Sequence, residues 1–178
     1  MTTAPPPIIR DATDADLPAI FDIYHEQVAT GSATFDTTPR TPEQQRAWMD
    51  AHRSPNRPVI VATDSAGAVL GWASVNQWSD RRAYDRTGEI SIYIRAGMRG
   101  MGIGRLLMRQ LIDRATAAGL CVLLARVTEG NPASLNLHLG HGFVTVGIMH
   151  RVGEKFGRIY DVRLLELHID GWSPAVQS

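Results

Sequence analysis

The chain has 178 residues, of which 18 are basic and 18 acidic, a length that suits one globular domain with a substantial core. The balanced charge argues against a nucleic-acid-binding protein, which typically carries a strongly basic surface. The single cysteine excludes an intramolecular disulfide and a cysteine-based zinc site.

The N-terminal residues have neither the charged start nor the apolar segment of a signal peptide. No apolar run reaches the ~18 residues of a membrane span. We therefore expect a cytoplasmic protein with no membrane partner. The six histidines are scattered without metal-ligand spacing, so we expect no metal site. The expected organisation is a flexible leader at 1–7, one domain at 8–169 and a tail at 170–178.

Hydrophobic periodicity and turn residues predict an α/β chain with the element order β-α-α-β-β-β-α-β-α-β-β. The first half contains a strand at 8–10, a helix with apolar residues from Leu17 to Val28, a helix opened by the capping box of Thr41 and Gln44, and paired strands at 58–63 and 68–75. A polar loop at 76–87 follows. The second half contains a strand at 89–94, a helix ending near Gly119, a strand at 121–127, a short helix at 132–139, and strands at 142–150 and 158–167.

Strict alternation marks the strand at 89–94. Its apolar side chains all point to one face, which we assign to the core: Ile90, Ile92 and Ile94. The opposite face collects an acid, a hydroxyl and a phenol: Glu89, Ser91 and Tyr93. A polar face of this composition on a buried strand indicates a functional site.

The loop that follows reads R-G-M-G-I-G over residues 99–104 and opens a long amphipathic helix. Glycines at alternate positions leave backbone N–H groups uncovered, and the helix N-terminus adds unpaired donors and the positive end of its dipole. Arg99 and Arg105 flank the loop. Its spacing matches neither the dinucleotide fingerprint nor the nucleotide phosphate loop. The loop therefore predicts a site for a phosphate-bearing ligand, with a pyrophosphate-bearing cofactor as the natural candidate.

Several segments follow one another along the chain: G-S-A-T-F-D at 31–36, R-R-A-Y-D-R-T-G-E at 81–89, I-Y-I at 92–94, the glycine loop, N-P-A-S-L-N-L-H at 131–138, G-F at 142–143 and V-G-E-K-F-G-R at 152–158. This series resembles the phosphinothricin and methionine sulfoximine acetyltransferase branch of the GNAT family of N-acetyltransferases. The resemblance extends from Ile8 to Leu167. It implies the GNAT fold, with a central mixed, mostly antiparallel twisted sheet of about six to seven strands flanked by helices.

The resemblance implies acetyl-CoA as co-substrate. The residues expected to bind it are Ile92, Tyr93, Ile94, Arg99, Gly100, Met101, Gly102, Ile103, Gly104, Arg105, Asn131 and Ser134. Asn131 has a second reading as a helix N-cap before Pro132. The resemblance also implies a homodimer, and the segment from Val144 to Leu167 is the expected contact.

An amine must lose a proton before or as it attacks a thioester, and a carboxylate or an imidazole can accept that proton. The resemblance implies Glu89 and His138 as the catalytic pair. The sequence leaves open which of them is the base.

The acceptor implied by the resemblance is a small amino acid or a toxic analogue, such as phosphinothricin, methionine sulfoximine or methionine sulfone. The residues expected to contact it are Phe35, Arg81, Tyr84 and Tyr93. The planar fork of arginine suits an acidic group, although Arg81 is equally consistent with a salt bridge in its loop. Two alternatives remain: a different amine (a polyamine, an aminoglycoside or a peptide N-terminus), and an acetyl-CoA sensor without catalysis. The Arg-rich loop at 81–86 disfavours a polycation, and Glu89 with His138 disfavours a sensor.

Overall fold

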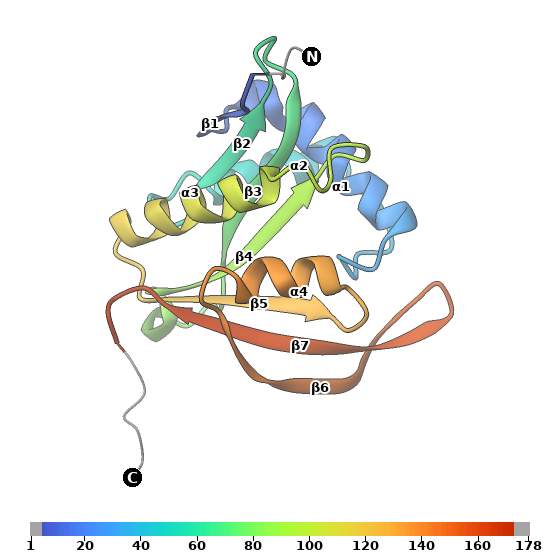
Figure 1. Ribbon diagram of the computed structural model, residues 1–178, viewed down its shortest axis with the longest axis vertical. Helices are drawn as coiled ribbons and strands as arrows, with labels where there is room; N and C mark the ends of the chain where they lie inside the picture. The colour runs from blue at the N-terminus through green and yellow to red at the C-terminus, as the bar shows by residue number, and fades with distance from the viewer. Residues whose placement is uncertain (1–4, 173–178) are drawn as a thin grey trace.

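The computed structural model describes residues 5–172, so the outermost parts of the expected leader and tail, 1–4 and 173–178, lie outside the described residues. The described chain forms the predicted series of elements (Figure 1): β1 (Ile8–Asp11), α1 (Leu17–Thr30), α2 (Pro42–Ala51), β2 (Val59–Thr63), β3 (Val69–Gln77), β4 (Thr87–Ile94), α3 (Ile103–Ala117), β5 (Val122–Thr128), α4 (Pro132–Leu139), β6 (Val144–Lys155) and β7 (Arg158–His168). Two short 3₁₀ turns accompany them, η1 (Asp14–Asp16) before α1 and η2 (Arg82–Tyr84) before β4.

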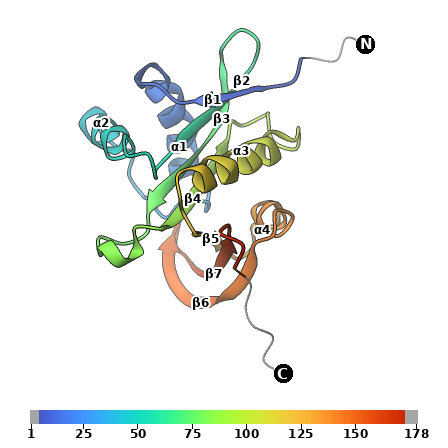
Figure 2. The same ribbon diagram turned by 90° about the vertical axis from the view of Figure 1, so that its left-hand side faces the viewer.

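The strands form one sheet in the order β1-β2-β3-β4-β5-β7-β6. Neighbouring strands are antiparallel except β4 and β5, which are parallel. Figure 2 shows α1 and α2 on one face of the sheet and α3 and α4 on the other. The expected α/β class with a mixed, mostly antiparallel sheet is confirmed.

A hydrophobic cluster covers each face of the sheet. Side chains of α3, including Leu107 and Leu111, pack on the face that Ile90 shares. Residues of α1, including Ile20, pack with Trp72 on the other face. Burying a side chain of this size stabilises the fold by about 1.5–3 kcal/mol. Between these packed regions the sheet is interrupted at one point, where two neighbouring strands separate.

Such a separation lies between β4 and β5. These strands pair only over Thr87–Glu89 and Val122–Leu124, although both continue for several residues beyond this point. The sheet therefore opens at its centre into a V-shaped gap, and the edges of β4 and β5 that face the gap keep backbone groups available to a ligand.

Local chemistry explains where the helices begin. At α2 the predicted capping box is present: the Thr41 N–H donates to Gln44 Oε1 at 2.9 Å, and the Gln44 N–H donates to Thr41 Oγ1 at 3.4 Å. Pro42 occupies the first helical position, where its missing N–H leaves no intrahelical bond unmade. Among residues 5–172, no helix combines the length and apolar character that crossing a membrane requires.

The expected end of the strand at 142–150 is wrong, because β6 continues to Lys155. The register shifts between Met149 and Gly153, which marks a bulge. The carboxylate of Asp161 on β7 accepts from the Arg151 N–H at 2.8 Å and lies 2.8 Å from His150 Nδ1. A side chain of the facing strand thus replaces ladder bonds that the bulge interrupts, and pairing resumes beyond it.

Candidate active site

A cleft of about 580 Å³ lies at the gap between β4 and β5. Loop residues after α1, the β4 and β5 edges, and α4 line it. Seven of the predicted site residues belong to this lining: Phe35, Glu89, Ile92, Tyr93, Asn131, Ser134 and His138. The two predicted catalytic residues therefore share one cavity, although they come from different elements.

His138 is the buried imidazole of this cleft, at 6% exposure on α4. Its Nδ1 lies 2.7 Å from the carbonyl oxygen of Ser134, so Nδ1 carries the proton and donates. Among the described residues no hydrogen bond is made by Nε2. Burial lowers the pKa of His138 below its ordinary value, outweighing the Ser134 bond, which favours the protonated form. The ring is therefore neutral at pH 7 and offers a free lone pair at Nε2.

Glu89 is bound by an arginine that the sequence analysis missed. Arg126 Nε donates to Glu89 Oε1 at 2.5 Å, and its second nitrogen donates to Oε2 at 2.6 Å. The bidentate pair raises the pKa of Arg126. Glu89 and Arg126 come from the two strands that diverge, so the pair spans the mouth of the gap. Both carboxylate oxygens accept from Arg126, so the pair joins the two diverging strands through two hydrogen bonds.

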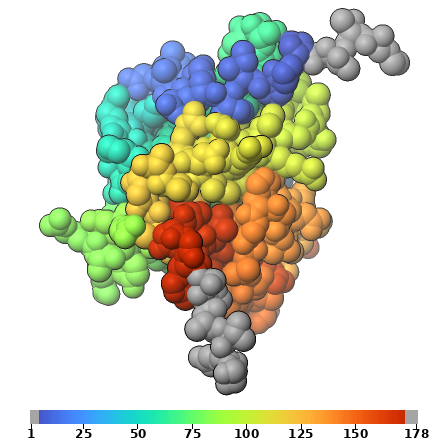
Figure 3. All heavy atoms as spheres, turned by 60° about the vertical axis from the view of Figure 1, so that its left-hand side comes forward, coloured from blue at the N-terminus to red at the C-terminus, as the bar shows by residue number. Residues whose placement is uncertain are grey.

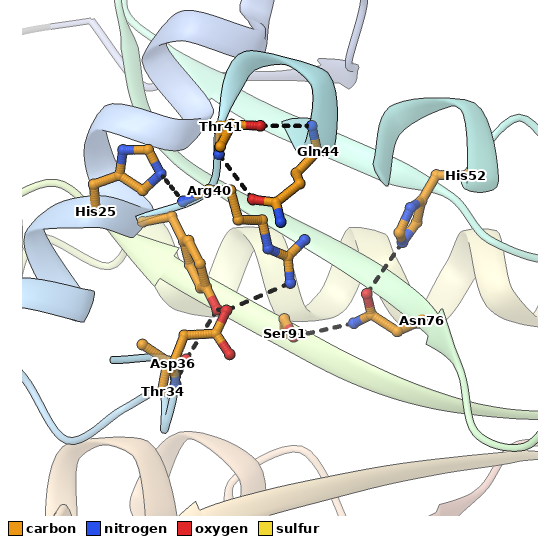
Figure 4. A network of polar contacts seen from close by, with 10 residues as sticks. His25, Thr34, Asp36, Arg40, Thr41, Gln44, His52, Asn76 and Ser91 are labelled. Atoms are coloured by element: carbon orange, nitrogen blue, oxygen red, sulfur yellow. Dashed lines mark hydrogen bonds and ion pairs between the residues drawn. The ribbon is translucent and has the colours of Figure 1, made fainter. Parts of the chain in front are cut away.

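A second polar cluster lines the cleft on the α1 side (Figure 4). The Tyr24 hydroxyl donates to Asp36 Oδ2 at 2.6 Å and lies 2.9 Å from Thr34 Oγ1. Burial and the Asp36 carboxylate raise the pKa of Tyr24 to about 12, so the phenol stays protonated. Arg40 points toward Asp36 at 3.6 Å and lies over the Tyr24 ring. At this distance the ion pair leaves guanidinium donors available to a ligand.

The floor of the cleft is polar where β3 meets β4. The Asn76 amide donates to Ser91 Oγ at 3.1 Å (Figure 4). It also donates to the backbone oxygen of Glu89 at 3.2 Å. On its other side Asn76 Oδ1 lies 3.1 Å from His52 Nε2. These bonds hold the Glu89 backbone against β3 and leave the Ser91 hydroxyl at the cleft surface.

Tyr93 lies in an aromatic cluster, with its ring centroid 5.2 Å from Tyr24 and 4.9 Å from Trp72. Burial raises the pKa of its phenol further than that of Tyr24. The ring thus packs in the core beneath α1 and contributes one surface to the cleft.

The glycine loop has the backbone that an anion site needs. Gly97, Gly100 and Gly102 all adopt positive φ, at 80°, 79° and 82°. Gly102 is the N-cap of α3 and supplies no side-chain acceptor, so the first N–H groups of the helix have no side-chain cap. A Cβ at Gly100 or Gly102 would meet open space. These residues fit the pyrophosphate of acetyl-CoA, with Arg99 and Arg105 exposed beside it.

Asn131 serves as the N-cap of α4, and its Oδ1 accepts from the Ser134 N–H at 3.1 Å. The cap reading of Asn131 is therefore correct, and Asn131 and Ser134 also line the cleft. Met101 is exposed and Ile103 buried, so Ile103 offers a ligand its backbone and not its side chain.

Arg81 and Tyr84 do not join the other predicted residues. They belong to the loop around η2, are exposed, and are absent from the cleft lining of their own chain. This loop, green in Figures 2 and 3, projects from the body of the molecule. Among the described residues no group of three or more metal-ligating side chains is present.

Three charged residues that line the cleft were not predicted from the sequence: Asp36, Arg40 and Arg126. Arg126 carried a usable signal, because it interrupts the apolar strand 121–127 with a charge. Asp36 ends the segment 31–36, but the segment alone does not indicate a role for its carboxylate. Arg40 carried no local signal, since only the fold brings it over Tyr24.

Comparisons with known proteins agree with this geometry. The family model described as "Acetyltransferase (GNAT) family" matches residues 18–143. The chain is 43% identical over 162 residues to the L-methionine sulfoximine/L-methionine sulfone acetyltransferase of Pseudomonas paraeruginosa, covering 91% of this chain and 94% of the relative. It is 37% identical over 161 residues to the phosphinothricin N-acetyltransferase of Streptomyces coelicolor, covering 89% of this chain and 94% of that one.

Among solved structures, a GNAT superfamily phosphinothricin acetyltransferase from Sinorhizobium meliloti in complex with AcCoA matches with a TM-score of 0.89 and 33% identity, over 97% of this chain and 95% of that chain. The split sheet, the cleft and the glycine loop thus define an acetyl-CoA-dependent transferase. The chain belongs to the GNAT family of N-acetyltransferases, in its phosphinothricin and methionine sulfoximine acetyltransferase branch. The predictions of this family, its fold and acetyl-CoA as co-substrate are confirmed.

Proposed function

We propose that the enzyme acetylates the amino group of a zwitterionic amino acid or amino acid analogue, such as methionine sulfone, methionine sulfoximine or phosphinothricin. The main support for this proposal is the charge of the side chains that line the cleft. Two carboxylates, Asp36 and Glu89, and two guanidinium groups, Arg40 and Arg126, line it. A balanced lining suits an acceptor with an ammonium and a carboxylate group, whereas a polycation requires an acidic site. The names of the relatives, which are acetyltransferases of such analogues, support the same class.

Arg40 is our candidate for the acceptor carboxylate. Arg40 lines the cleft, and within residues 5–172 its guanidinium makes one ion pair, the 3.6 Å contact with Asp36, so its planar fork has donors for a bidentate contact. Glu89 supplies the matching negative charge for the ammonium. Phe35 offers an apolar surface for the stem between these groups.

His138 is our candidate for the base. Its neutral ring and free Nε2 allow it to take a proton from the attacking amine, directly or through water. The new N–C bond forms as the C–S bond of the thioester breaks, and the proton on Nε2 then passes to the departing CoA thiolate. An acceptor bound as an ammonium first loses one proton to solvent, so of the two protons that leave the nitrogen one goes to water and one to sulfur, and His138 returns to its starting form. Backbone N–H groups at the β4 edge would bond the thioester oxygen as its charge grows.

Release of the CoA thiol tests the proposed function. Purified protein with acetyl-CoA should turn over methionine sulfone, methionine sulfoximine and phosphinothricin, and should give no turnover with spermidine or with a peptide that has a free N-terminus. Turnover confined to spermidine or the peptide would contradict the acceptor class. Acetyl-CoA binding without turnover of any acceptor would contradict catalysis and favour the sensor.

Exposed apolar side chains on β6 support the expected homodimer. Val144, Val146 and Ile148 are 56%, 53% and 38% exposed, a pattern typical of a contact surface. Arg81 and Tyr84 lie outside the cleft of their own chain, so their proposed contact with the acceptor requires a second copy. Light scattering should give twice the mass of one chain, and Val146→Asp should give a monomer because it buries a charge. A monomeric unsubstituted protein would contradict the dimer.

A further inference from the structure

Lys155, the only lysine of the chain, is a buried cation at the end of β6. It is 3% exposed, and its Nζ donates to three backbone oxygens: to Gly31 at 2.8 Å, to Thr34 at 2.8 Å and to Gln27 at 3.2 Å. An ammonium group has three N–H donors, and all three are used. Burying a charge is costly unless it is fully hydrogen-bonded, so this arrangement indicates that the Lys155 ammonium group has a specific structural role.

The three acceptors belong to the end of α1 and the loop that follows it. The last carbonyls of a helix have no intrahelical partner, and a cation there also complements the negative end of the helix dipole. Lys155 therefore holds the start of the 31–36 loop from a position more than 120 residues further along the chain. A second tie comes from β5, where the Thr128 hydroxyl donates to the Ser32 oxygen at 2.7 Å.

Gly153 on β6 allows the same loop to pack closely against this strand. A Cβ at this position would lie 2.0 Å from Cε2 of Phe35, so only glycine lets the ring rest on the strand. The ring also packs against Tyr160 of β7, with centroids 5.9 Å apart. Figure 1 shows the β6–β7 hairpin extending beyond the rest of the sheet to the side on which the loop after α1 lies.

The 31–36 loop held by these contacts forms one wall of the cleft, because Thr34, Phe35 and Asp36 all line it. We propose that Lys155 and Gly153 are positioning residues that set the affinity for the acceptor by holding this wall against the β6–β7 hairpin. Neither residue lines the cleft, and the glycine loop lies on other elements. The inference rests on the proposed function, in which this side of the cleft receives the acceptor.

A matched pair of glycine variants in one strand tests the proposal, with methionine sulfone as the probe. Gly153→Ala should raise the acceptor KM about tenfold or more, with kcat within about threefold, because it displaces a binding wall and no reacting group. Gly147→Ala is the control, since a Cβ there has no atom within 4 Å. Acetyl-CoA affinity, measured by calorimetry, should be unchanged in both. An unchanged acceptor KM in folded Gly153→Ala, or a parallel loss of acetyl-CoA affinity, would overturn the proposal.

Lys155→Met should raise the same KM, and its effect should largely vanish when Phe35 is already alanine, because both changes remove one wall. Independent, additive effects would contradict a shared role. A readout without turnover keeps this test separate from the proposed function. Reductive methylation should label the peptide containing Lys155 slowly in the folded wild type and faster in Gly153→Ala. Equal labelling rates of this peptide in the wild type and in Gly153→Ala would contradict the packing of the loop against β6, whatever the acceptor is.

Discussion

Replacing His138 with alanine should lower kcat by about 10²–10⁴-fold, the range expected when a general base is lost. Acetyl-CoA affinity should stay close to that of the wild type, because the imidazole acts on the amine. The pH dependence should change as well. Burial lowers the pKa of His138 below its ordinary value, so the ring is neutral at pH 7 and becomes protonated only as the pH falls further. Wild-type kcat should therefore decline on the acidic side, and His138→Ala should lose that decline.

His141 provides the control for this prediction. Its Nδ1 lies 2.7 Å from the Leu137 oxygen, just as His138 Nδ1 lies 2.7 Å from the Ser134 oxygen. His141 does not line the cleft. His141→Ala thus removes an equivalent imidazole-to-backbone bond and should keep nearly full activity. Equal losses in both variants, or lost acetyl-CoA binding in His138→Ala, would contradict the role of His138.

Replacing Gly102 with valine should weaken acetyl-CoA binding about 100-fold, a loss of about 2.7 kcal/mol. Its φ of 82° disfavours any side chain, and a branched one would stand over the exposed N–H groups at the start of α3. Titration calorimetry with acetyl-CoA measures the effect directly.

Gly67, in the turn between β2 and β3, provides a control variant that distinguishes backbone strain from the loss of a ligand contact. Its φ is 88°, and a Cβ there would also meet open space. Both valine variants should lower the free energy of unfolding by similar amounts, on the order of 1–3 kcal/mol. Only Gly102→Val should lose acetyl-CoA affinity. Wild-type affinity in Gly102→Val would show that the phosphates bind elsewhere.

Local chemistry predicted the parts of the site that one segment encodes. The capping box at Thr41, the alternation over 89–94 and the glycine loop each need only neighbouring residues, and each lies in the element expected for it. The alternation placed Glu89, Ser91 and Tyr93 on one face, and all three line the cleft, but Ile90 and Ile92 of the other face line it as well.

Pairings between distant segments escaped prediction. Glu89 and Arg126 are 37 residues apart and meet only because β4 and β5 are neighbours. Arg40 reaches Tyr24 through the course of the loop after α1. The length of β6 depended on Asp161 of the facing strand, which bonds the bulge. Arg81 and Tyr84 share a motif with Glu89, yet the fold carries them away from the cleft of their own chain.

The central claim is that the balanced cleft selects a zwitterionic acceptor. The most direct measurement compares kcat/KM for methionine sulfone with that for 3-(methylsulfonyl)propylamine, which lacks only the carboxylate. A charge-assisted contact to Arg40 contributes about 1.5–3 kcal/mol, so the amino acid should be favoured about 10- to 150-fold. Arg40→Met should remove most of that preference. Equal kcat/KM for the two acceptors would contradict the claim.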